Sequence, residues 1–148
     1  MPYLDTITIV CIGLMIGTEF AVSAFVNRTL RQLDDVAQLN VIQILAKMLG
    51  TVMPFWYALS LILLMTEAGL RHAENGFGLL VTSAVMWGVV VVMMVLFVVP
   101  MNNRLARMGS TVVAAQALQE HARWNSLHRV RVAVLGVAMI CFLVAIRA

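Results

Sequence analysis

One acidic residue lies inside an apolar run that is long enough to cross a membrane. Glu19 sits toward the end of the run from Thr6 to Val26, roughly 10 Å inside a bilayer if the run is helical. Placing a carboxyl group at that depth costs on the order of 3 kcal/mol, so such residues usually face a bundle interior and take part in function. Glu19 is therefore a candidate catalytic base. The competing interpretation is a protonated carboxyl group that only hydrogen-bonds a neighbouring helix.

Lys47 lies at a similar depth in the second apolar run. Opposite charges at matched depth favour a buried pair with Glu19, which would place Lys47 beside a bound molecule. The alternative is that Lys47 extends its aliphatic stem toward the headgroups at the cytoplasmic face. The sequence leaves both possibilities open.

A second polar group opens the last apolar run. Trp124, His128 and Arg131 are spaced i, i+4 and i+7, so they share one helix face. An imidazole transfers protons near neutral pH, a guanidinium stabilises an anionic oxygen, and an indole stacks on flat rings. This face is a candidate site with His128 and Arg131 as catalytic residues and Trp124 contacting the substrate. The alternative is an interfacial polar stripe without a ligand.

The third run ends in Pro100-Met101-Asn102-Asn103-Arg104. Asn102 can donate and accept hydrogen bonds, and Arg104 can hold a carboxylate or enolate oxygen with two parallel bonds. Both are candidate substrate-binding residues. The simpler interpretation is a helix C-terminus whose arginine favours the helix dipole.

Trp87 lies in the middle of the third run, beside several methionines. A stripe of aromatic and methionine side chains usually packs in a core. It can also form the wall of a pocket for a flat apolar molecule, so Trp87 is a further candidate for substrate contact.

The elements that must position these residues are membrane-spanning helices. The 148 residues are 62% apolar and 11% charged, more apolar surface than a soluble domain of this size can bury. Four runs approach the roughly 20 residues that a spanning helix needs, and in lipid such runs must be helical. They cover residues 6–26, 44–66, 77–99 and 130–146. We predict a single all-α domain over residues 1–148, a four-helix transmembrane bundle.

The connection over residues 100–129 is not expected to be a loop throughout. Pro100 should stop or kink the third helix, and Gly109-Ser110 is a stop-and-cap signal. From Thr111 one helix should run into the fourth span. Its length to Ile146 would be about 54 Å against a bilayer core of roughly 30 Å. We therefore expect an amphipathic cytoplasmic extension of the fourth helix.

Arginine distribution predicts the orientation. The two longer connections and the start of the fourth span hold seven arginines: Arg28, Arg31, Arg104, Arg107, Arg123, Arg129 and Arg131. The other side holds Arg71 and Arg147. By the positive-inside rule the connections are cytoplasmic and both termini lie outside. We expect a multi-pass protein of the cell inner (cytoplasmic) membrane that contacts lipid and can form homo-oligomers.

Composition argues against two classes of function. The net charge of +3 is small and the basic residues lie at helix ends, where they orient a membrane protein, so no nucleic acid partner is expected. The two cysteines, Cys11 and Cys141, lie far apart without a CxxC pair. A thiol–disulfide enzyme needs vicinal cysteines to pass electrons.

Two sequence blocks resemble the anthrone-oxygenase-like family of small four-helix membrane proteins. The first block ends the third helix and contains Pro100, Asn102, Arg104 and Leu105. The second block opens the fourth helix and contains Arg123, Trp124, His128 and Arg131. The stretch from Gly17 to Ser23 is similar to the family's first helix. Glu19 and Lys47 match no family motif, and the proline common after the first helix is replaced by Asn27-Arg28.

The resemblance implies an oxygenase or oxidoreductase that acts on a hydrophobic aromatic or quinone-like molecule in a pocket opening to the cytoplasmic half. Most members have no known function, and the few with an assigned activity oxidise anthrones to anthraquinones with oxygen, without a cofactor. Such chemistry needs a base, a cation for the oxyanion and an apolar slot. His128 or Glu19 would be the base, Arg131 or Arg104 would hold the oxyanion, and Trp124 would stack on the ring.

Three other functions remain open from the sequence. A metal- or haem-binding protein would use His128, Glu19 and Asn102 as ligands for a transition metal, giving a metal-assisted oxygenase. A small proton-coupled exporter would use Glu19. A non-catalytic, partner-binding protein would use its polar stripes only to fix helix packing. The sequence also leaves open whether Glu19 reaches His128.

Overall fold

The computed structural model describes residues 2–107 and 114–148, with the side chains of residues 2–104 and 122–148. This part of the chain is helical apart from short turns. The helices in order are α1 (Pro2–Ala21), η1 (Val22–Val26), α2 (Asn27–Leu30), α3 (Asp35–Leu70), α4 (Phe77–Met93), η2 (Met94–Val98), α5 (Val99–Arg107) and α6 (Ala114–Ala145). Consecutive helices join into four segments long and apolar enough to cross a membrane, over Pro2–Leu30, Asp35–Leu70, Phe77–Arg104 and Ala122–Ala145.

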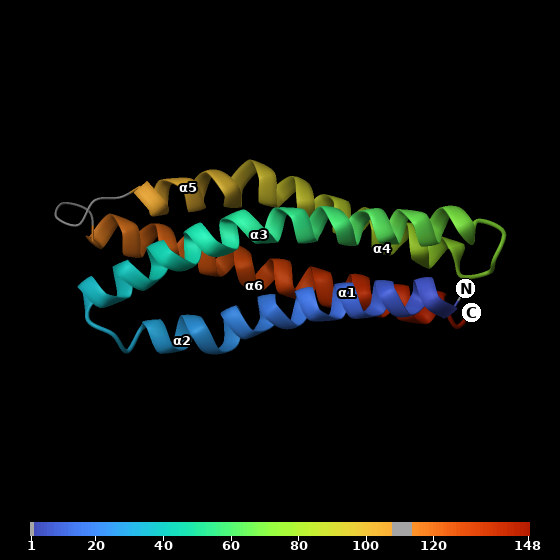
Figure 1. Cartoon of the computed structure of the whole chain (residues 1–148), viewed down its shortest axis with the longest axis horizontal. Coiled ribbons are helices and arrows are strands. Elements are labelled where there is room, and N and C mark those ends of the chain that lie inside the picture. The colour runs from blue at the N-terminus through green and yellow to red at the C-terminus, as the bar shows by residue number, and fades with distance from the viewer. Residues whose placement is uncertain (1, 108–113) are drawn as a thin grey trace.

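The four segments run up and down in one elongated bundle (Figure 1). Both chain termini lie at one end, next to the turn between α3 and α4, and this end is called the termini end below. The link from α2 to α3, the end of α5 and the start of α6 lie at the opposite end, called the connection end. The predicted all-α four-helix membrane bundle is therefore confirmed.

Core positions recur at alternating spacings of three and four residues. On α6 the buried positions are His128, Arg131, Leu135, Ala138, Phe142 and Ala145. On α3 they include Met53, Tyr57, Ser60, Leu64 and Glu67, and Arg71 just past its end continues the spacing. This heptad spacing is typical of helices that pack at small angles in four-helix bundles. Several polar side chains occupy these positions, so the same pattern that builds the core also buries charge.

Two π-helical turns, η1 and η2, shift this pattern near the connection end. In η1 the amide of Asn27 donates to the carbonyl of Val22, five residues back, and Asn27 becomes buried. In η2 the shift buries Val98 and leaves Phe97 56% exposed. Single π-turns occur often at functional sites. Here both occur at the level of the polar cluster described below.

The ends of the spans differ from the sequence expectation. The predicted connection after the first span, residues 27–43, is helical except for residues 31–34, because Asp34 caps α3 by accepting from the amide of Ala37 at 3.0 Å. Pro100 does not end the third helix. It follows η2, where the amide of Val99 donates to the carbonyl of Met94, five residues back. The regular i to i−4 hydrogen bonding that a proline would break is therefore already interrupted at the residue before Pro100.

The long fourth helix agrees with the prediction. It is continuous as α6 from Ala114 to Ala145, about 48 Å at 1.5 Å per residue. The predicted start at Thr111 and the Gly109-Ser110 signal lie outside the described residues. At the connection end a small second core of Leu30, Leu39, Ile42 and Met101 joins α2, α3 and α5, and the α6 side chains Trp124 and Leu127 pack against it.

Candidate functional site

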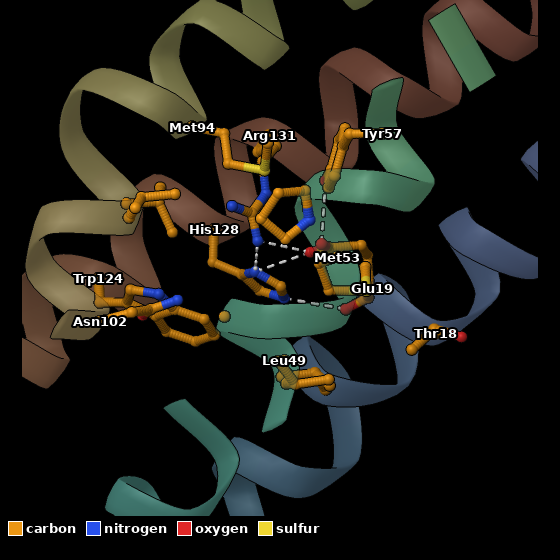
Figure 2. A pocket seen from close by; sticks show the side chains of 15 residues that line it. Thr18, Glu19, Leu49, Met53, Tyr57, Met94, Asn102, Trp124, His128 and Arg131 are labelled. Atoms are coloured by element: carbon orange, nitrogen blue, oxygen red, sulfur yellow. Dashed lines mark hydrogen bonds and ion pairs between the residues drawn. The ribbon is translucent and has the colours of Figure 1, made fainter. Parts of the chain in front are cut away.

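Glu19 lies at the centre of a buried polar cluster with partners on two other helices. Its Oε2 is 2.6 Å from Nη2 of Arg131 on α6, and its Oε1 accepts from the hydroxyl of Tyr57 on α3 at 2.9 Å. The side chains of Glu19 and Arg131 are 3% and 4% exposed. Figure 2 shows these side chains pointing toward one another between the helices. One negative and one positive charge are thus sealed together inside the bundle.

His128 joins the cluster through both ring nitrogens. Its Nε2 is 2.9 Å from the backbone carbonyl of Glu19, and because a carbonyl only accepts, Nε2 carries the proton. Its Nδ1 lies 2.6 Å from Nη2 of Arg131 and 3.0 Å from Oε2 of Glu19. A guanidinium only donates and a carboxylate only accepts, so Nδ1 lies between a donor on Arg131 and an acceptor on Glu19. Glu19 and His128 therefore share one site.

Two tryptophans hold these residues in place in different ways. Trp124 stacks on His128 with ring centroids 4.6 Å apart and an interplanar angle of 13°. Trp87 donates from Nε1 to the backbone carbonyl of Tyr57 at 3.2 Å and packs against its ring. The guanidinium of Arg131 also lies over the Tyr57 ring, 5.7 Å from its centroid. These contacts restrict the rotamers around Glu19.

The cluster forms one wall of a cavity of about 20 Å³. Because about 10–15 Å³ of such space holds one water molecule, the cavity admits a water or a dioxygen molecule as it stands. Its lining combines the polar cluster with apolar side chains of η1, α3 and η2, and includes Glu19, Tyr57, His128, Arg131, Asn102, Trp124, Val22, Leu49, Met53, Met94 and Val98. Nε of Arg131 is buried and has no hydrogen-bond partner in the described part of the chain. A donor without a partner beside an apolar cavity suits a ligand oxygen.

The structure brings together five of the predicted site residues: Glu19, His128, Arg131, Asn102 and Trp124 all line this cavity. Their roles in catalysis and binding stay predictions.

The other three predicted substrate-contacting residues do not line it. Lys47 is exposed, and the charge that pairs with Glu19 is that of Arg131, so the pair with Lys47 is wrong and the extended alternative fits. Arg104 is exposed, because α5 carries it on the face opposite Asn102. Trp87 is fully buried in the core, where it supports Tyr57.

Sequence reasoning missed Tyr57 and a second buried cluster at the termini end. There Arg71 contacts Asp5 at 2.6 Å, Glu67 at 3.2 Å and Glu74 at 3.1 Å. Glu67 is fully buried and accepts from Thr8. The available signal was the spacing of three and four residues that places Tyr57 and Glu67 on one face of α3.

Arg71 lies just past the end of α3, and its ionisation reflects this cluster. Burial works to lower the pKa of its guanidinium. The hydrogen bond and charge of Asp5, with the charges of Glu74 and Glu67, outweigh burial and leave the pKa of Arg71 above its ordinary value. Arg71 is therefore a permanent cation that ties α1 to α3.

The geometry does not favour the predicted metal site. Arg131 already lies 2.6 Å from both Glu19 and His128, so a metal ion there would have to displace a cation. Both nitrogens of His128 are engaged. Among the described residues, no three histidine, cysteine, aspartate or glutamate side chains form a group that could hold a metal. The fixed partner of Glu19 also removes the main reason for the exporter hypothesis, an unpaired carboxyl group within a span.

Comparison with known families decides the relationship. The family model described as anthrone oxygenase matches residues 39–141. The chain belongs to the anthrone oxygenase family. The matched range holds Tyr57, Asn102, Trp124, His128 and Arg131, while Glu19 precedes it. No curated protein and no solved structure matches the chain significantly.

Family membership confirms the resemblance seen in the sequence and identifies the chain as an oxygenase-like membrane protein. The two sequence blocks that resemble this family, at the end of the third span and the start of the fourth, contribute side chains to the same cavity. Asn102 from the first block and Trp124, His128 and Arg131 from the second all line the cavity.

Proposed function

We propose that this protein is a membrane-embedded oxygenase that converts a hydrophobic, anthrone-like aromatic to a quinone with dioxygen. The observation that carries the proposal is the Glu19–Arg131 ion pair, 2.6 Å long and almost fully buried, in the wall of an apolar cavity. A carboxylate in such a place can accept a proton, and a guanidinium can stabilise an oxyanion. In this mechanism the side chains supply the base and the cation.

The first step is proton transfer from the substrate's acidic C–H to Glu19. The negative charge passes from the carboxylate to the enolate oxygen, and the guanidinium of Arg131 remains paired with it. The net charge of the cavity does not change, which matters because an uncompensated charge is costly inside a protein. Nε of Arg131, which has no hydrogen-bond partner among the described residues, is a donor available for that oxygen.

The enolate then reduces dioxygen and bonds to it. One electron passes from the enolate to oxygen, the radical pair combines into a C–O bond, and the peroxide takes the proton from Glu19. Removal of the remaining C–H proton by Glu19 forms the carbonyl, breaks the O–O bond and releases hydroxide, which takes that proton to become water. Overall, a CH₂ group and O₂ give C=O and H₂O.

His128 and Tyr57 act in this mechanism as positioning residues. The Nε2–H of His128 holds the backbone of Glu19, and its Nδ1 lies beside Oε2. The hydroxyl of Tyr57 holds Oε1. Of the two bases that the sequence allowed, we favour Glu19, because both nitrogens of His128 are already engaged by protein groups.

The test compares two glutamate-to-glutamine variants of the purified protein in lipid nanodiscs. With an anthrone and oxygen, Glu19→Gln should slow quinone formation by about 100-fold or more, the usual contribution of a general base. Glu67→Gln removes an equally buried carboxylate at the termini end and should keep the wild-type rate.

Two results would contradict the proposal. If wild-type protein forms quinone no faster than empty nanodiscs, the polar cluster only fixes helix packing, as in the hypothesis of a non-catalytic, partner-binding protein. Equal rates in wild type and Glu19→Gln would show that the chemistry takes place without this carboxylate.

We further propose that the connection end faces the cytoplasm of a cell inner membrane, with both termini outside. Arg131 is buried in the ion pair and no longer counts as an orienting charge. The remaining arginines still favour the connection end, with Arg28, Arg31, Arg104, Arg107, Arg123 and Arg129 against Arg71 and Arg147.

A further inference from the structure

A second cavity adjoins the first on the side of the connection end. Its volume is about 30 Å³, and its lining is Val22, Asn27, Ile42, Leu45, Ala46, Leu49, Asn102 and Trp124. Four of these side chains also line the cavity at Glu19: Val22, Leu49, Asn102 and Trp124. The two cavities are therefore neighbouring spaces divided by a shared wall.

Neither cavity alone can hold a drug-sized molecule, since pockets for such ligands measure about 300–1,000 Å³. The largest side chain in the shared wall is Trp124. Its indole lies flat on His128, 4.6 Å away and nearly parallel, beside Asn102 in Figure 2. If this ring moved aside, the two cavities and the volume of the indole would join into one flat slot ending at Glu19.

We propose that Trp124 holds the place of a flat, fused-ring aromatic ligand and that the second cavity is the subsite for its far ring. The near ring would stack on His128 as the indole does, since offset parallel stacking is favourable for aromatic rings. A slot vacated by a planar bicyclic side chain has the thickness of one ring, so it selects planar ligands over branched or saturated ones of similar volume.

The amides that line the second cavity indicate what its ligand carries. Asn27 and Asn102 are 3% and 9% exposed, and both line this otherwise apolar space. Nδ2 of Asn27 donates to Oδ1 of Asn125 at 3.0 Å, tying α2 to α6 beside Trp124. Buried amides favour a ligand that offers hydrogen-bonding oxygens. The ligand class is a fused aromatic with a hydroxyl or carbonyl oxygen on the ring far from Glu19.

Binding of 1,8-dihydroxyanthraquinone to the full-length protein in nanodiscs, measured by equilibrium dialysis, tests the role of Trp124. In the wild type the probe must displace the indole, which lowers the apparent affinity. Trp124→Leu and Trp124→Ala should each bind it at least tenfold more tightly. The control is Trp56→Leu, because Trp56 is half-buried on α3 and lines neither cavity, and its affinity should equal that of the wild type.

The use of two variants keeps the test decisive if the alanine variant is poorly folded. Unchanged or weaker binding in Trp124→Leu would overturn the proposal, since it would make the indole a fixed wall rather than a placeholder.

A second comparison tests the subsite itself. Ala46 lines only the second cavity, so Ala46→Leu should weaken binding of the three-ring probe about tenfold and leave phenol binding unchanged. Ala58→Leu, on the exposed face of the same helix, should change neither. Equal three-ring affinity in Ala46→Leu and wild type would exclude the second cavity as the subsite.

The proposal rests on the proposed function only for the reaction that follows binding. Because binding is measured without turnover, a failure here leaves the result for Glu19→Gln standing, and inactive wild-type protein leaves the binding result standing.

Discussion

The buried pair of Glu19 and Arg131 makes a specific prediction about stability. Their side chains are 3% and 4% exposed and 2.6 Å apart. Removing one partner of such a pair costs about 3–5 kcal/mol, because the remaining charge is buried without its counter-ion. Arg131→Met and Glu19→Gln should therefore each lower the free energy of unfolding by about that amount. Glu19→Gln falls toward the lower end, since Arg131 can still donate to His128.

The double variant should lose much less than the sum of the two single variants. With both charges gone no buried charge lacks a partner, and replacing a whole buried pair is often nearly neutral. We expect a coupling energy of at least about 3 kcal/mol, the upper end of the usual range for residues in contact. This size would show that the two charges neutralise each other, as the proposed proton transfer requires.

The assay is equilibrium unfolding of the four proteins in mixed micelles with increasing denaturing detergent, followed by circular dichroism. The exposed residue Arg129, two positions from Arg131 on the same helix, supplies the matched control. Arg129→Met combined with Glu19→Gln should be additive within about 0.5 kcal/mol. Additivity of the Arg131→Met and Glu19→Gln effects would refute the ion pair and the charge argument built on it.

Three further predictions concern the rest of the molecule. Arg71→Met should destabilise the protein by about 3–5 kcal/mol, because it leaves the fully buried Glu67 without its cation; a loss below 1 kcal/mol in the same unfolding assay would contradict this. Tyr57→Phe should cost about 2 kcal/mol, the worth of a hydrogen bond to a charged group, and should cost clearly less when Glu19 is already glutamine. A periplasmic phosphatase fused to the C-terminus should be active, because such enzymes are active only outside the cytoplasm. A fluorescent protein that becomes fluorescent when fused to the C-terminus would instead place that end in the cytoplasm and reverse the proposed orientation.

The types of the site residues were readable from the sequence because charge inside an apolar run is expensive. Glu19 stood out for this reason, and the i, i+4, i+7 spacing of Trp124, His128 and Arg131 placed these three on one face. The cation that pairs with Glu19 could not be identified from the sequence. Depth counting matched only Lys47 to Glu19, whereas the rotation of each helix in the bundle decides that Arg131 faces Glu19.

Helix rotation also explains the other differences. The π-turns η1 and η2 each add one residue to a turn and bring Asn27 and Val98 to the inner face. Nothing in the local composition marks these turns, because valine, phenylalanine and methionine occur throughout the spans. Glu67 was missed because it lies just past the apolar run that defined the second span.

Several expectations stay predictions. Association with lipid and formation of homo-oligomers concern partners that lie outside a single chain. The amphipathic cytoplasmic extension has a helical counterpart in α6, while the side chains at its start lie outside the described residues.

Oxygen-isotope labelling tests the central claim most directly. With anthrone and ¹⁸O₂, wild-type protein in nanodiscs should place one labelled atom in the new quinone carbonyl and the other in water, faster than empty nanodiscs. Glu67→Gln should do the same, and Glu19→Gln should fall to the uncatalysed rate. Quinone formed at equal rates with and without the protein, or carrying oxygen from water, would contradict an oxygenase whose base is the carboxylate of Glu19.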